Sequence, residues 1–211
     1  MIRYILFDLD CTLYSVRYGL EENVVVRLKQ YLARYLGTSV EKAAAERNIY
    51  IATGQYGTTL EWLIAEKGFT DTADYFAYIH PENEADSLPP DPELRRFIEN
   101  LPYPCSILTN SPLFHAERII RKLGLEGLFN RIFDIESNGL KGKPDASAFR
   151  RALDALGLKP EEVLFVDDTP RYVEGFLALG GRGILFDERD DHTNYPHDRI
   201  KNLTELTRFL N

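Results

Sequence analysis

The chain has 211 residues, a net charge of −8 and an apolar fraction of 44%. An acidic protein repels nucleic acid backbones and anionic membranes, so we expect neither a nucleic acid polymer nor a membrane as its main partner. The two cysteines, Cys11 and Cys105, form no Cys-x-x-Cys motif, which argues against a disulfide scaffold and a zinc site. Because the sequence shows neither a basic leader nor an apolar run of membrane-spanning length, we expect a cytoplasmic protein.

The first element is an apolar run, residues 2–7, that ends in Asp8-Leu9-Asp10-Cys11-Thr12. Such a run is typical of a buried strand of a parallel sheet, and ligands bind at the carboxyl ends of such strands. Two carboxylates about 4 Å apart repel by roughly 4 kcal/mol at an effective dielectric constant of about 20. A bound cation or a retained proton must offset this repulsion, and both suit phosphoryl transfer. The alternative is that Asp8 and Asp10 are ordinary turn or cap residues.

A helical insertion follows. Apolar residues at helical spacing, with glycine stops, predict four helices before the rigid Pro-rich linker at 88–92: 20–36, 40–51, 59–67 and 72–79. We therefore divide the chain into a core domain, residues 1–14 and 89–211, and a helical cap domain, residues 15–88.

Strands and helices then alternate. Strands are expected at 104–109, 131–135, 163–166 and 183–186, and helices at 93–100, 115–123, 145–156 and 172–179, with a last amphipathic helix from Ile200 to Leu210. This pattern predicts right-handed βαβ units. The expected fold class is α/β, a three-layer Rossmann-like core with a five-stranded parallel sheet plus the inserted four-helix cap.

Further polar groups fall at the same edge of the sheet: Thr109-Asn110-Ser111, Lys143-Pro144 in the first turn of a helix, and Asp167-Asp168. Exposed N–H groups after residue 109 suit an anion. For Ser111 we favour the role of a helix N-cap. The alternative for Lys143 is a solvated side chain, as is usual for a single lysine before a helix. Four carboxylates at one edge predict a hard divalent cation, Mg²⁺.

The four motifs, in this order, resemble the haloacid dehalogenase (HAD) superfamily over residues 2–186. The resemblance implies that Asp8 is the nucleophile, that Asp10 is the general acid and base, and that the sheet is ordered fifth, fourth, first, second, third. It also implies that Asp8, the Asp10 carbonyl and Asp168 bind Mg²⁺, with Asp167 as an alternative or outer ligand. Thr109, Asn110 and Lys143 would hold the phosphoryl group. An acid at Asp10 is typical of the phosphatases and mutases of this superfamily, whereas the dehalogenases lack it.

Several stretches are similar to the pyrimidine 5′-nucleotidases, among them Tyr56 to Leu60 and His115-Ala116. Cys11 departs from the usual Asn, and we expect its side chain to point away from the substrate. Tyr56, Thr58 and Thr59 are the candidate specificity residues, although this stretch also suits a plain inter-helix turn, and the cap aromatics Tyr50, Tyr56 and Trp62 suit cap packing. The four histidines show no metal spacing, and for His115 we favour helix packing.

The predicted function is a Mg²⁺-dependent phosphomonoester hydrolase that works through an aspartyl-phosphate on nucleoside 5′-monophosphates. The alternative substrate is a phosphosugar or another small phosphorylated metabolite. A mutase and a non-catalytic binding module on the same scaffold are further alternatives. The protein is expected to be a monomer or a homodimer.

Overall fold

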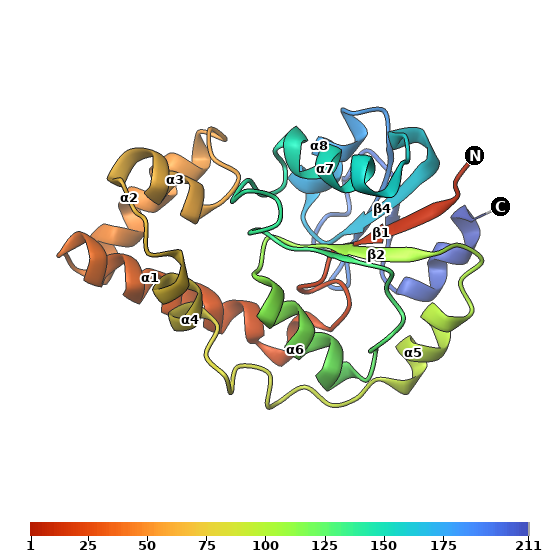
Figure 1. The fold of residues 1–211 in the computed structure, drawn as a ribbon, viewed down its shortest axis with the longest axis horizontal. Helices are drawn as coiled ribbons and strands as arrows, with labels where there is room; N and C mark the ends of the chain where they lie inside the picture. Colours follow the sequence, from red (N-terminus) through yellow and green to blue (C-terminus); the bar gives the residue numbers. More distant parts are fainter. Residues whose placement is uncertain (211) are drawn as a thin grey trace.

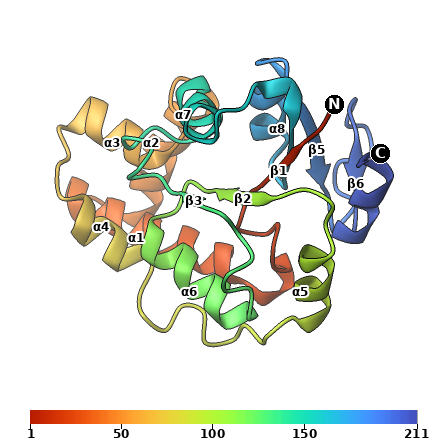
Figure 2. The same ribbon diagram turned by 45° about the vertical axis from the view of Figure 1, so that its right-hand side comes forward.

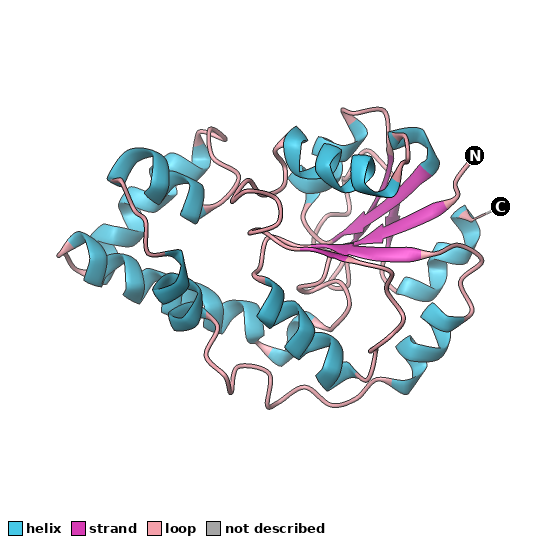
Figure 3. Ribbon diagram, in the orientation of Figure 1, coloured by secondary structure: helices cyan, strands magenta, loops and turns pink. Residues whose placement is uncertain are grey.

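The computed structural model describes residues 1–210, and six parallel strands form its sheet in the order β3-β2-β1-β4-β5-β6 (Figure 3). The bounds are β1 Tyr4–Phe7, β2 Cys105–Leu108, β3 Ile132–Phe133, β4 Val163–Asp167, β5 Arg182–Phe186 and β6 Arg199–Ile200. The order predicted for the first five strands is confirmed. The sixth strand was missed: Ile200 lies in β6, and the last helix is the 3₁₀ segment Leu203–Phe209. Two residues are too few to show the alternation by which a strand is recognised.

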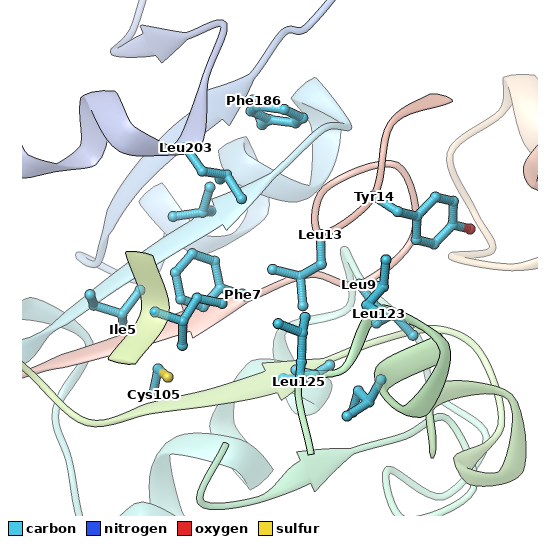
Figure 4. Packing of buried hydrophobic residues seen from close by; sticks show 14 of the residues in the cluster. Ile5, Phe7, Leu9, Leu13, Tyr14, Cys105, Leu123, Leu125, Phe186 and Leu203 are labelled. Atoms are coloured by element: carbon cyan, nitrogen blue, oxygen red, sulfur yellow. The ribbon is translucent and has the colours of Figure 1, made fainter. Parts of the chain in front are cut away.

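Alternate residues of the central strand pack on opposite faces of the sheet, as the geometry of a strand requires. Ile5 and Phe7 join one buried cluster, shown in Figure 4, and Tyr4 and Leu6 join another. Helices α5 (Pro92–Glu99) and α6 (Leu113–Leu123) cover the first face, and α7 (Ala146–Leu156) and α8 (Pro170–Leu177) cover the second (Figures 1 and 2). The three-layer α/β architecture is therefore confirmed.

The four predicted insertion helices are present as α1 (Leu20–Leu36), α2 (Val40–Ala52), α3 (Thr59–Lys67) and α4 (Thr72–Ile79). They lie beyond the carboxyl end of the sheet (Figure 1) and share a buried cluster that includes Leu32, Trp62 and Phe76. Leu20, Ala85 and Leu88 pack instead in the cluster beside β1. The ends of the insertion thus rest on the sheet layer, and the division at residues 15 and 88 stays a prediction.

Within residues 1–210, no helix combines the length and the apolar character that crossing a membrane requires.

Candidate active site

Lys143 links two carboxylates at the carboxyl edge of the sheet. Asp8 directly follows β1 and Asp167 is the last residue of β4, so pairing of these strands brings the two side chains together. The Nζ atom of Lys143 donates to Asp8 Oδ1 at 2.5 Å and to Asp167 Oδ2 at 2.6 Å. All three side chains are buried, and an ion pair in such a place is stable only when its charges are matched by close partners.

The same edge carries more negative charge than Lys143 neutralises. Burial raises the pKa of Asp8 although the Lys143 charge opposes this, and burial together with Asp167 raises the pKa of Asp168 to about 8. Carboxylate oxygens of Asp8, Asp167 and Asp168 lie within 4.8 Å of one another. Three hard oxygen donors around a surplus of negative charge fit Mg²⁺. The Asp10 carbonyl as a further ligand stays a prediction.

Asp10 is held by hydrogen bonds from four side chains. Its Oδ1 accepts from Tyr14 Oη at 2.7 Å and from His115 Nε2 at 2.8 Å. Its Oδ2 accepts from Ser111 Oγ at 2.8 Å and, more weakly, from Thr109 Oγ1 at 3.5 Å. Burial raises the pKa of Asp10, but the charge and hydrogen bond of His115 outweigh burial and hold it well below its usual range. The structure therefore fixes both oxygens of Asp10 and favours its carboxylate.

Two sequence-based expectations are wrong here. Ser111 is not a helix N-cap, because Pro112 occupies that position of α6 and the Ser111 hydroxyl bonds to Asp10. His115 does not merely pack in its helix, since it contacts Asp10 directly.

His115 in turn connects Asp10 to the segment that follows the cap helices. Its Nδ1 lies 2.8 Å from Glu84 Oε1, and Glu84 also contacts His80 and Arg118. Burial opposes the charged imidazole, but Asp10 and Glu84 together raise the pKa of His115 to about 10. Ligand atoms of His80, Glu84 and His115 lie within 4.8 Å of one another, although the histidine spacing in the sequence did not suggest a metal site. These atoms are already engaged with one another and with Asp10 and Arg118.

The loop before α7 is positioned by Asn110. The Asn110 side chain accepts from the backbone N–H of Lys143 at 2.8 Å and donates to the carbonyl of Lys143 at 3.1 Å. Pro144 precedes the N-cap, Asp145, and so lies outside the first turn where we expected it. The side chain of Asn110 thus fixes where Lys143 stands, while Thr109 lines the adjoining cavity.

A cavity of about 310 Å³ opens above these groups and is closed on its other side by the cap. Asp8, Asp10, Thr109, Asn110, Lys143 and Asp168 line it, together with Thr58 and Thr59. Tyr56 is not in the lining: its hydroxyl donates to Glu66 and accepts from Gln55. Tyr50 and Trp62 stack on each other with ring centres 5.2 Å apart, also outside the lining.

Cys11 lines this cavity, whereas we expected its side chain to point away. Its φ of 57° is in the left-handed region, which Asn tolerates better than most residues. The turn after β1 therefore holds Cys11 in a backbone conformation that would suit an Asn better.

The cap touches the core at the residue before Lys143 and at the start of α8. Glu61 Oε1 accepts from the N–H of Gly142 at 2.9 Å, and Arg171 Nη2 donates to the carbonyl of Gly57 at 2.7 Å. A Cβ atom at Gly142 would lie 2.6 Å from Thr58 Cγ2, so only glycine allows this approach. The contact closes the cavity over the carboxylates.

A comparison with protein families matches residues 2–180 to the model described as "Hydrolase: haloacid dehalogenase-like hydrolase". The chain belongs to this family. The predicted enzyme class, a HAD-type phosphatase, agrees with this match and with the names of curated relatives.

Two of these relatives span nearly the whole chain. A phosphoglycolate phosphatase of Aquifex aeolicus is 28% identical, covering 95% of this chain and 96% of its own. A glyceraldehyde 3-phosphate phosphatase of Methanopyrus kandleri is 26% identical, covering 100% and 99%. These names favour small phosphorylated metabolites and do not support the resemblance to pyrimidine 5′-nucleotidases.

Among solved structures, the HAD-hydrolase YfnB of Bacillus subtilis, described as bound to magnesium and showing interdomain movement, superposes with a TM-score of 0.60. It is 19% identical, covering 99% of this chain and 98% of its own. This likeness supports the fold of the HAD hydrolase described here.

Proposed function

We propose that this HAD hydrolase cleaves the phosphomonoester of a small phosphorylated metabolite through an aspartyl-phosphate on Asp8, with Mg²⁺ as cofactor. The observation that carries the proposal is the meeting of Asp8, Lys143 and Asp10 in one cavity, where Lys143 neutralises Asp8 and four side-chain donors orient Asp10. This arrangement supplies a nucleophile, a positive charge and an acid–base group within one closed space.

The reaction runs in two halves. A carboxylate oxygen of Asp8 attacks phosphorus while the bond to the leaving oxygen breaks, and Asp10 protonates that oxygen. Water then attacks phosphorus, Asp10 accepts its proton, and the bond to Asp8 breaks to release inorganic phosphate. The proton that Asp10 takes from water is the one it gives to the leaving oxygen of the next turnover, and the donors around Asp10 favour its carboxylate, the form that the second half requires.

Asp8 and Asp168 would hold Mg²⁺, with the Asp10 carbonyl as a further ligand and Asp167 as an outer or alternative one. Bound there, the ion would neutralise negative charge on the phosphoryl group. Thr109, Asn110 and Lys143 would bind the phosphoryl oxygens, and Lys143 already faces Asp8.

The substrate we propose is a small phosphometabolite such as a phosphosugar or a phosphorylated acid. The cavity volume of about 310 Å³ is at the lower end of the range for ligand sites. Tyr56, the residue we expected to stack on a base, lies outside the lining of the cavity. The prediction of a nucleoside monophosphate substrate therefore loses the residue on which it mainly rested. Thr58 and Thr59 line the cavity, and we retain them as candidate specificity residues.

The test is a phosphate-release screen over small phosphorylated acids, phosphosugars and nucleoside monophosphates, with Mg²⁺ and with EDTA. We expect turnover of small metabolites that EDTA abolishes and Mg²⁺ restores. Full turnover in EDTA would contradict the metal assignment. Preference for nucleotides would contradict the substrate class.

A further inference from the structure

Two arginines line the active-site cavity without a carboxylate partner. Arg47 comes from α2 in the cap, and Arg171 comes from the first turn of α8 in the core. Both are half-buried, and neither forms a salt bridge within residues 1–210. Lys143, in the same cavity, is paired with two carboxylates. The proposed phosphate machinery therefore leaves these two charges unused.

Hydrogen bonds hold both guanidinium groups in place, most of them to α2, to the start of α3 and to the loop between these helices. Arg47 Nε donates to Thr59 Oγ1 at 2.7 Å and its Nη1 donates to Asn48 Oδ1 at 3.3 Å. Arg171 Nη2 donates to the Gly57 carbonyl and, at 3.1 Å, to Tyr172 Oη. A guanidinium has five N–H donors, so each arginine keeps donors for a ligand. Thr59, one of the predicted specificity residues, thus orients Arg47.

The two charges are close enough to affect each other. Burial lowers the pKa of Arg47, Tyr75 and Glu21 oppose this effect, and the charge of Arg171 adds to it. Glu21 lines the same cavity, but it makes no salt bridge to either arginine in the described chain. Two like charges at the wall of one cavity are favourable when an anion joins them.

We propose that Arg47 and Arg171 bind a carboxylate on the leaving group, so that the substrate class is the phosphate esters of small hydroxy acids. This inference rests on the proposed phosphatase function. The planar fork of Arg matches the two oxygens of a carboxylate, and a neutral leaving group would leave both charges unmatched. Because the cavity is small, the hydroxy acid must be short.

The test compares two substrates of similar size, 2-phosphoglycolate and ethyl phosphate, with the full chain and Mg²⁺. Wild-type kcat/KM should favour 2-phosphoglycolate by about tenfold or more, the size expected for hydrogen bonds to a charged group. Arg47→Gln and Arg171→Gln should each lower kcat/KM on 2-phosphoglycolate by about tenfold to a hundredfold and on ethyl phosphate by less than about threefold. Arg34→Gln, which removes a cap arginine that pairs with Asp74 outside the cavity, should change neither.

Equal kcat/KM on the two substrates in the wild type, or equal losses on both in the variants, would overturn the carboxylate assignment. Hydrolysis of ethyl phosphate in that case leaves the phosphatase proposal standing, whereas no hydrolysis of any phosphate ester overturns both.

A second measurement needs no variant. With an aryl phosphate as substrate, glycolate should inhibit the wild-type protein competitively, and ethylene glycol, of similar size and without charge, should not. Equal inhibition by both would overturn the proposal even where a variant fails to fold.

Discussion

The two walls of the cavity differ in how their charged groups are satisfied. On the core wall, Asp8 and Lys143 are buried and paired at 2.5 Å, and both oxygens of Asp10 accept hydrogen bonds. On the cap wall, Arg47 stands among apolar residues such as Leu28 and Ile51 and has no ion-pair partner in residues 1–210. The groups of the core wall that contact one another are held in the arrangement that one reaction needs. The unpaired guanidinium group of the cap wall is available to bind a ligand. We infer that chemistry belongs to the paired groups of the core wall, and selection to Arg47 of the cap together with Arg171 at its edge in the core.

Among substitutions in the core wall, Asp8→Asn should lower activity the most. The amide cannot form an aspartyl-phosphate, so kcat should fall on the order of a thousandfold or more on every substrate. Steady-state phosphate release measures this, and circular dichroism shows whether the fold is kept. Turnover near that of the wild type would contradict the covalent mechanism.

A smaller loss is expected from His115→Gln, which removes one donor from Asp10 and the link to Glu84. Removing an orienting partner of a functional group typically costs about tenfold to a hundredfold, and the loss should fall on kcat for all substrates alike. His197→Gln, at an exposed histidine, is the matched control and should retain full activity. If His115 only fills space, the pH profile of kcat should keep its shape in the variant, and a changed profile supports a role through Asp10.

The smallest expected effect concerns the turn that leads from β1 into the cavity. Cys11→Asn places a residue that tolerates positive φ at a position with φ of 57°, and should raise the free energy of unfolding by on the order of 0.5 kcal/mol. A thermal or urea melt checks this. A destabilised variant would show that packing of the thiol outweighs the backbone preference.

Much of the core wall could be predicted because each of its acidic residues follows a strand. Apolar runs ending in Asp8 and in Asp167-Asp168 put carboxylates at one edge, and parallel pairing of β1 and β4 leaves little freedom in where they meet. The helices of the cap were also predicted within a residue or two, since their apolar residues recur at helical spacing and glycines end α1 and α3.

What could not be predicted depends on contacts between distant segments. His115, Glu84 and Asp10 come from three parts of the chain, and no local pattern joins them. Arg47 lies on a helix whose face toward the core is set by docking of the cap, and Tyr56 was misplaced for the same reason. Periodicity shows which residues form a helix, but not which neighbour the helix meets.

The most direct test of the central claim is to trap the covalent intermediate. Asp10→Asn should form the aspartyl-phosphate from an aryl phosphate, whose leaving group needs little acid, but should lose the base for water attack. Rapid mixing, acid quench and mass spectrometry of the peptide that carries Asp8 would then show a near-stoichiometric burst of aryl alcohol and phosphate on Asp8. Absence of both, in a variant whose wild-type parent hydrolyses the same ester, would contradict the account.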